Sequence, residues 1–215
     1  MKPATGCAVV AVVIFAKAPV AGYAKTRLAP ALGAEGAACL AERLLLETSL
    51  QAVQAAIGPV EICATPDTTH PAFLALGLRF GVALVGQGEG DLGLRMHRAF
   101  ARTLALHRGA IVIGTDAPGL GALYLRGAAR ALETHDAVLG PAMDGGYTLI
   151  GLRRPDATLF DDIAWSTPRV LQQTRERLAR AGLSHAELAP LDDVDEPADL
   201  HHVPRAWLPP GGKAG

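Results

Sequence analysis

Three basic side chains near the start of the chain have the types and spacing needed to bind an anion. Lys17, Lys25 and Arg27 flank a stretch that contains Pro and Gly, and ammonium and guanidinium groups pair strongly with phosphate oxygens. Gly22 lies between them and lets the backbone approach a ligand closely. The stretch therefore indicates a site for a phosphate-bearing ligand, with a solvated polar loop as the alternative.

Acidic residues in three later segments are candidate partners of such a ligand. Asp116 follows a short apolar segment, and a carboxylate there can hold Mg²⁺ or Mn²⁺ together with substrate phosphates. Asp144 precedes a pair of glycines and can bind a sugar hydroxyl or an attacking group. Five acidic residues crowd into segment 192–199, which is costly unless water or a cation screens them. The structural alternatives are a helix cap or turn, a hairpin and a solvated acidic turn.

A glycine pattern in segment 88–93 matches the dinucleotide-binding sequence G-x-G-x-x-G. Asp116 lies at about the distance expected for a ribose-binding acid. Glu89 and Asp91 place negative charge in the loop that would receive the pyrophosphate, and the basic stretch would be left without a role. We therefore expect the basic stretch, and not this pattern, to bind phosphate.

The elements around these residues must bring them together. An apolar run that ends at Lys17 predicts a buried strand, and residues 110–114 are apolar throughout, as expected at the centre of a parallel sheet. Further strands are expected at 60–64, 79–85, 137–140, 147–152 and 186–191, and helices at 35–56, 71–76, 92–107, 122–133 and 167–181. This alternation predicts a mainly parallel sheet with helices on both faces, which binds ligands outside the carboxyl ends of its strands.

Composition and charge limit the class of protein. The formal net charge is −1 at pH 7, which argues against nucleic acid or an acidic membrane surface as the main partner. We expect one domain over residues 1–203 and a loose tail over 204–215 that is rich in Pro and Gly. Cys7, Cys39 and Cys63 are widely spaced in apolar contexts and are expected to be reduced core thiols of a cytoplasmic protein. No Ser, Cys or His pattern indicates covalent catalysis.

Five segments resemble, in order, the motifs of one family. They are FAKAPVAGYAKTRL (15–28), QGEGDLG (87–93), GTDAPGL (114–120), GPAMDGGY (140–147) and WSTPRVL (165–171). The family is the glycosyltransferase-like transferases associated with arsenosugar biosynthesis. It is similar to the GT-A fold and to the molybdenum-cofactor and 2-phospholactate guanylyltransferases. The resemblance covers nearly the whole chain up to about residue 200 and implies a three-layer α/β/α sandwich with a mostly parallel sheet.

The resemblance also implies roles for particular residues. The nucleotide-binding residues would be Lys17, Pro19, Gly22, Lys25, Thr26 and Arg27. The metal ligands would be Asp116 and Asp195, with Asp116 and Asp144 as catalytic residues. The acceptor or sugar side would be formed by Gly145, Gly146, Tyr147 and Trp165. The chain departs from the guanylyltransferases in lacking their glycine-rich opening loop, and segment 115–117 lacks the second aspartate of the D-x-D motif.

The sequence therefore predicts a metal-dependent glycosyltransferase that uses Mg²⁺ or Mn²⁺, a nucleotide-sugar donor and a small-molecule acceptor. Direct displacement is the expected mechanism, with electrostatic stabilisation of the departing diphosphate. Nucleotidyl transfer with release of pyrophosphate is one alternative, and a non-catalytic nucleotide-binding domain is another. The missing glycine-rich loop favours glycosyl transfer, and the oligomeric state is left open.

Overall fold

Seven strands form one sheet at the centre of the structure. The computed structural model describes residues 9–208, and within them the strands lie in the order β3-β2-β1-β4-β6-β5-β7. Their bounds are β1 Val10–Lys17, β2 Val60–Thr65, β3 Ala83–Gly86, β4 Gly109–Ile113, β5 Ala137–Pro141, β6 Tyr147–Leu152 and β7 His185–Glu187. Neighbouring strands run parallel except at β6, which is antiparallel to both β4 and β5. The prediction of a mainly parallel sheet is confirmed.

Helices connect these strands. The α-helices of the described region are α1 Ala29–Ala55, α2 Pro71–Phe80, α3 Leu92–Leu104, α4 Ala122–Thr134 and α5 Val170–Arg180, and its 3-10 helices are η1 Thr26–Leu28, η2 Ala157–Leu159, η3 Pro197–His202 and η4 Arg205–Trp207. The strand predicted over 79–85 begins only at Ala83, because α2 continues to Phe80 and ends at Gly81 in the left-handed conformation. No helix within residues 9–208 has both the length and the apolar character needed to cross a membrane.

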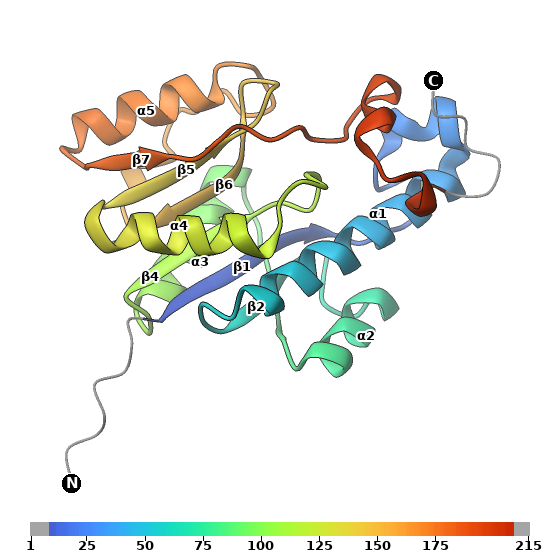
Figure 1. The fold of residues 1–215 in the computed structure, drawn as a ribbon, viewed down its shortest axis with the longest axis horizontal. Helices are drawn as coiled ribbons and strands as arrows, with labels where there is room; N and C mark the ends of the chain where they lie inside the picture. Colours follow the sequence, from blue (N-terminus) through green and yellow to red (C-terminus); the bar gives the residue numbers. More distant parts are fainter. Residues whose placement is uncertain (1–8, 209–215) are drawn as a thin grey trace, which may run out of the picture.

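β1 explains why the sheet is covered on both sides. Val12 and Ile14 pack with residues of α1, α2 and α4, whereas Val13 packs with residues of α3 and α5. This division follows from the alternation of side chains along a strand. β4 is buried along its whole length, as predicted for a central strand. Figure 1 shows α1 and α4 crossing in front of the strands, and the predicted three-layer sandwich is confirmed.

A third apolar cluster joins the C-terminal segment to the first part of α1. Its buried members are Leu28, Ala37, Leu40, Leu44, Val194, Leu200 and Val203. Trp207 and Leu208 pack against the same cluster, and Figure 1 shows this red segment beside the blue start of α1. Packing therefore continues beyond the predicted domain end at residue 203, and the rest of the predicted tail lies outside the described residues.

The two described cysteines differ in their surroundings. Cys63 is buried, and burial raises the pKa of its thiol to about 11. Cys39 is exposed, so the prediction of a core thiol is wrong at this position, because Cys39 lies on the solvent side of α1. Cys7 lies outside the described residues.

Candidate functional site

The carboxyl ends of β1 and β4 open into a cavity of about 690 Å³. These strands are parallel neighbours, so the loops that follow them lie at the same edge of the sheet. The C-terminal segment completes the wall, and the volume is in the range of small-molecule sites. The charged residues that line the cavity are Lys17, Lys25, Arg27, Asp116, Asp144, Asp195 and Glu196. The structure thus brings together basic and acidic side chains that are far apart in the sequence.

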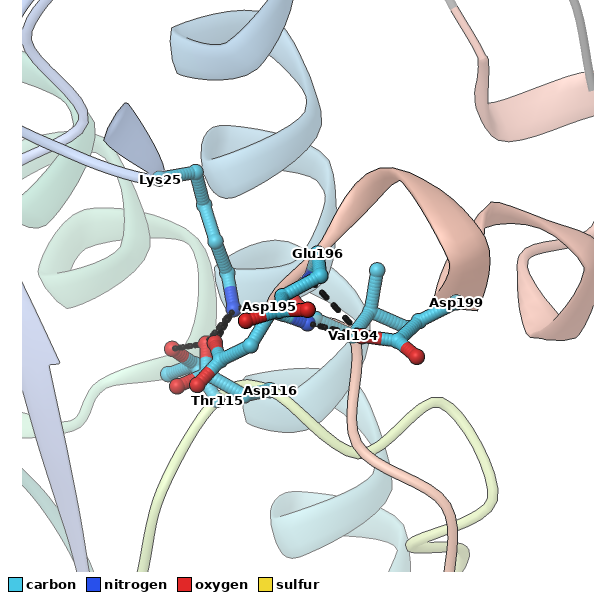
Figure 2. A network of polar contacts seen from close by, with 7 residues as sticks. All are labelled: Lys25, Thr115, Asp116, Val194, Asp195, Glu196 and Asp199. Carbon is cyan, nitrogen blue, oxygen red and sulfur yellow. Dashed lines mark hydrogen bonds and ion pairs between the residues drawn. The ribbon is translucent and has the colours of Figure 1, made fainter. Parts of the chain in front are cut away.

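Lys25 connects the basic loop to two carboxylates. Its Nζ lies 2.6 Å from Oδ1 of Asp116 and 2.9 Å from Oδ1 of Asp195. The same ammonium donates to the backbone oxygen of Val194 at 2.5 Å. Figure 2 shows the Lys25 side chain reaching down between these groups. All three of its N–H donors therefore have an acceptor.

The charge of Lys25 is maintained despite its burial. Only 7% of the side chain is exposed, and this desolvation acts to lower the pKa of its ammonium. The negative charges of Asp116 and Asp195 outweigh that effect, so the pKa of Lys25 is raised. The residue has a φ of 49°, a left-handed conformation that is uncommon for a residue with a Cβ. The loop accepts this conformation in a position where the side chain reaches both carboxylates.

Hydrogen bonds that do not involve Lys25 hold the backbones on which the two carboxylates stand. The amide of Val194 donates to the backbone oxygen of Asp116 at 2.9 Å. The carboxylate of Asp199 accepts from the backbone amides of Asp195 and Glu196 at 3.0 and 2.7 Å, which forms a capping box at the start of η3. These contacts fix the acidic segment against the loop that follows β4.

Lys17 and Arg27 differ from Lys25 because neither makes an ion pair with a described residue. The Nζ of Lys17 lies 3.9 Å from the centroid of the Tyr23 ring, a cation–π contact. Both basic side chains line the cavity. They are therefore the cations most directly available to an incoming phosphate.

A second hollow of about 420 Å³ adjoins the first and shares Arg27, Asp144, Asp195 and Glu196 with it. Asp193 also lines this hollow. Burial raises the pKa of Asp193 to about 6, and the negative charges of Asp144, Asp195 and Asp116 add to the shift. Negative charge therefore accumulates at this end of the site beyond what Lys25 neutralises.

The donor set meets part of what a divalent metal ion requires. Asp116 and Asp195 supply carboxylate oxygens, the ligands that Mg²⁺ and Mn²⁺ prefer. Among residues 9–208 there is no group of three or more His, Cys, Asp or Glu side chains arranged to hold a metal ion. Two carboxylates still fit Mg²⁺, because this ion is commonly held by one or two carboxylates and by substrate phosphates. The residues present therefore fit a metal that binds together with a phosphorylated substrate.

Several predicted site residues take other positions. Trp165 does not line the cavity; it packs with the cluster under α3 and lies against Gly93. The hydroxyl of Tyr147 points toward Sδ of Met96 at 3.9 Å, and burial raises its pKa further above its usual value. Both aromatic rings therefore pack against the core, and Tyr147 also lines the small hollow beside Asp116 and Asp144. Their contact with a sugar or acceptor stays a prediction.

The glycines and Pro19 of the predicted site have backbone roles. Pro19 and Gly22 do not line the cavity, and Gly22 serves the turn of the loop with a φ of 75°. Gly146 lines a small hollow beside Asp116 and Asp144, and its amide donates to Oδ1 of Asp144 at 2.8 Å. Thr26 lines the main cavity, and its contact with a nucleotide stays a prediction. The predicted loop is thus present, but only part of it faces the cavity.

The cavity also has lining residues that the sequence prediction did not include. They include the polar residues Tyr23, Thr65, Gln87, Thr115, Ser166 and Thr167. The amide of Gln87 donates to the backbone oxygens of Cys63 and Ala16 at 2.9 and 3.4 Å. The sequence signal that could have identified Gln87 is its position directly after β3, at the same edge of the sheet as the basic loop.

The G-x-G-x-x-G segment does not form a phosphate cradle. The guanidinium of Arg98 donates to the backbone oxygens of Gln87 and Glu89 at 2.7 and 3.0 Å. A phosphate-binding loop presents its N–H groups to the ligand, whereas this loop presents carbonyl oxygens to a cation. The structure therefore supports the choice of the basic stretch over this pattern.

Comparisons with known proteins give a family and a fold. The family described as "Uncharacterized protein conserved in bacteria (DUF2064)" matches residues 47–167. No curated protein matches the chain in sequence. A protein from Desulfovibrio desulfuricans G20, provisionally assigned as a nucleotide-diphospho-sugar transferase, is 30% identical with a TM-score of 0.81, and the match covers 92% of this chain and 87% of that chain. This likeness confirms the predicted GT-A type of fold.

Two more distant structures share the fold. CMP:2-keto-3-deoxy-manno-octonic acid synthetase, complexed with CTP, is 14% identical with a TM-score of 0.55, over 91% of this chain and 96% of that chain. Glucosyl-3-phosphoglycerate synthase from Mycobacterium tuberculosis, in complex with Mn²⁺, UDP and glucosyl-3-phosphoglycerate, is 10% identical with a TM-score of 0.53, over 89% and 74% of the two chains. The same architecture therefore occurs in a nucleotidyl and in a glycosyl transferase.

Proposed function

The chain belongs to the DUF2064 family, and we propose that it is a metal-dependent glycosyltransferase that uses a nucleotide-sugar donor. One observation carries the proposal: Lys17, Lys25 and Arg27 line the same cavity as the carboxylates of Asp116 and Asp195. The cations suit the diphosphate of the donor, and the carboxylates suit a divalent ion. The assignment of the Desulfovibrio relative supports the same class of reaction.

Asp116 and Asp195 would hold Mg²⁺ or Mn²⁺ together with the donor phosphates. When bound, such an ion supplies positive charge that stabilises the diphosphate as it leaves. The crystal complex of glucosyl-3-phosphoglycerate synthase with Mn²⁺ and UDP supports this choice of metal and ligand. Mn²⁺ is therefore the first metal to use in binding experiments.

The chain's own residues bind and orient the two substrates. Lys17 and Arg27 contact the donor diphosphate and add to the neutralisation of its charge. Asp144, which lines both the main cavity and the adjoining hollow, orients the acceptor hydroxyl or accepts its proton. A bond then forms between the acceptor oxygen and the sugar carbon as the bond from that carbon to the phosphate oxygen breaks. The acceptor is a small molecule, and the link to arsenosugars stays a prediction of the resemblance.

A thermal-shift panel of nucleotides and nucleotide sugars, with and without Mn²⁺, tests the proposed donor class. A ligand at a hundredfold excess over its Kd stabilises the folded chain by about 2.7 kcal/mol. We expect nucleoside diphosphates and nucleotide sugars to raise the melting temperature more with Mn²⁺ than without it. The absence of a metal-linked shift with every nucleotide would overturn the proposal.

Asp116→Ala tests the metal role within the same panel. The side chain is half-exposed, so we expect the variant to fold and to lose the Mn²⁺-linked part of the nucleotide shift. Asp192→Ala, which removes an exposed carboxylate of the acidic segment, is the matched control and should keep the shift. If Asp116→Ala binds the nucleotide in the presence of Mn²⁺ as the unmodified chain does, Asp116 has a structural role only.

The released product separates glycosyl transfer from the two alternatives. Turnover of the stabilising nucleotide sugar releases a nucleoside diphosphate, whereas nucleotidyl transfer from a triphosphate releases pyrophosphate. Chromatography of the reaction with a panel of hydroxylated acceptors distinguishes these products. Tight nucleotide binding with no release of either product would favour a non-catalytic nucleotide-binding domain.

A further inference from the structure

We propose that Lys25 is a tethered cation that competes with the divalent metal ion for the carboxylates of Asp116 and Asp195. In the nucleotide-free protein the ammonium holds both carboxylates, and the nucleotide phosphates draw it away. Nucleotide and metal then bind cooperatively. The inference rests on the proposed function, because it assumes that a phosphorylated donor enters this cavity.

The contacts of Lys25 leave it no spare donor. Its Nζ lies 2.6 Å from Asp116, 2.9 Å from Asp195 and 2.5 Å from the backbone oxygen of Val194, so each of its N–H groups is engaged. In the nucleotide-free protein the Lys25 ammonium is therefore bound to the carboxylates and has no N–H group free to bind a ligand. Lys17, by contrast, makes its described contact with the face of the Tyr23 ring.

The backbones that carry the two carboxylates have contacts that do not involve Lys25. The bond from the Val194 amide to the Asp116 backbone oxygen ties the two loops together at 2.9 Å. Asp199 anchors the Asp195 backbone at 3.0 Å. When the ammonium leaves, two negative charges stay close together without compensation. That is an arrangement that a divalent cation stabilises.

Accessibility also favours exchange at the carboxylates. The Asp116 and Asp195 side chains are 46% and 42% exposed, whereas Lys25 is 7% exposed. A hydrated metal ion can therefore reach these carboxylates from the cavity, whereas the Lys25 side chain is largely shielded from solvent. Phosphates that bind Lys17 and Arg27 bring negative charge into this cavity, where it attracts the Lys25 ammonium away from its partners.

Mn²⁺ titration of the nucleotide-free protein tests the competition, with electron paramagnetic resonance or calorimetry as the readout. We expect Lys25→Met to bind one Mn²⁺ at least tenfold more tightly than the unmodified chain. The gain should disappear in Lys25→Met/Asp195→Asn. Lys17→Met removes a positive charge from the same cavity but none from the carboxylates, so it is the matched control and should bind Mn²⁺ as the unmodified chain does.

Coupling between the ligands gives a second readout. By linkage, Mn²⁺ strengthens nucleotide binding by the same factor as nucleotide strengthens Mn²⁺ binding. We expect this factor to be smaller in Lys25→Met, because the metal no longer needs the nucleotide to free its ligands. Equal Mn²⁺ affinities of the unmodified chain and Lys25→Met would overturn the inference.

Folding of the variants is part of the test. Lys25→Met should melt at a lower temperature than the unmodified chain without metal and recover with Mn²⁺. Lys25→Gln, which keeps an amide donor, is the second variant. If neither folds even in excess Mn²⁺, the metal cannot take the place of the ammonium and the inference is wrong. A tenfold gain in Mn²⁺ affinity with no nucleotide binding would instead support the competition and overturn the proposed function.

Discussion

Individual carboxylates in the site differ in how their charge is balanced. Lys25 pairs with Asp116 and Asp195, whereas Asp193 faces the negative charges of its neighbours and is partly desolvated. A pKa of about 6 for Asp193 means that the folded protein keeps this carboxyl protonated up to a higher pH than the usual value of 3.8 allows. The same end of the cavity therefore contains two carboxylates that share one ammonium and one carboxyl that resists ionisation.

Asp193→Asn should change how stability depends on pH. Because the folded pKa is raised above the ordinary value of 3.8 to about 6, the folded chain binds more protons than the unfolded chain between these values. The contribution of Asp193 is fully present below about pH 4 and is lost as the pH rises through about 6. We expect the unmodified chain to lose stability over this range and Asp193→Asn to lose less.

Urea unfolding at several pH values measures this effect. Asp161→Asn removes an exposed carboxylate outside the acidic segment and should leave the pH dependence close to that of the unmodified chain. Identical pH profiles for Asp193→Asn and the unmodified chain would show that folding does not raise the pKa of the Asp193 carboxyl.

Arg27→Met should weaken nucleotide binding without a loss of stability. Its guanidinium lines both hollows, and a hydrogen bond to a charged group contributes about 1.5–3 kcal/mol. We therefore expect roughly a tenfold to hundredfold rise in Kd, measured by calorimetry at fixed salt. Arg130→Met, at an exposed position of α4, is the control. An unchanged Kd in Arg27→Met would remove this residue from the proposed donor site.

At the scale of elements, the sequence predicts where β1 and β4 lie in the chain. It predicts only part of what surrounds them, namely which strands pair with them and which distant side chains reach the same cavity. Apolar runs before Lys17 and Asp116 predict buried strands, and parallel pairing places both residues at one edge. The antiparallel insertion of β6 between β4 and β5 was not predicted, because strand pairing depends on contacts between distant segments. The bond of Lys25 to Asp195 spans 170 positions and has no local signal for the same reason.

The aromatic residues of the predicted site show that a local motif does not predict where a large side chain is buried. Tyr147 and Trp165 lie in glycine- and proline-containing motifs beside the cavity, yet both rings pack into the core with α3. A sequence motif locates a loop, but the burial of a large ring is decided by the neighbouring helix. The charged residues of the predicted site do line the cavity. Lys, Arg and Asp side chains are rarely buried in an apolar core, so they remain at the surface or line a polar cavity.

Two loops that meet at the cavity depend on Gly145. Its φ is 90°, and a Cβ there would lie 2.4 Å from the backbone oxygen of Pro168. Gly145→Ala should therefore destabilise the fold by more than the about 1–2 kcal/mol expected for a left-handed residue alone. Gly22→Ala is the matched control, since its φ is 75° but nothing lies within 4 Å of the added Cβ. If Gly145→Ala and Gly22→Ala lose the same unfolding free energy in urea, the two loops move apart around the new Cβ without a measurable loss of stability.

At the scale of the whole molecule, the small third cluster determines whether Asp195 reaches the site. The segment from Val194 to Leu208 contributes no strand to the sheet. It is held by Val194, Leu200 and Val203, which pack in a cluster with residues of α1. Asp195 lies at one end of this segment, next to buried Val194. The site therefore depends on a satellite core that is separate from the two large clusters.

Leu200→Ala should weaken the site more than its stability cost explains. Leu200 is 1% exposed, so the substitution is expected to cost about 2–5 kcal/mol. The loss falls on the segment that positions Asp195, so we expect weaker Mn²⁺-linked nucleotide binding. Hydrogen exchange should also become faster at the Val194 amide, which bonds to the Asp116 backbone oxygen.

Leu178→Ala separates this local effect from general destabilisation. Leu178 is also fully buried, but it belongs to the cluster between the sheet and helices α3 and α5, and not to the third cluster that holds the segment carrying Asp195. A similar loss of unfolding free energy is expected, with nucleotide affinity retained and the Val194 amide exchanging no faster than global unfolding allows. If both variants lose affinity in proportion to stability, the segment and the sheet form one cooperative unit, and the third cluster has no separate control over Asp195.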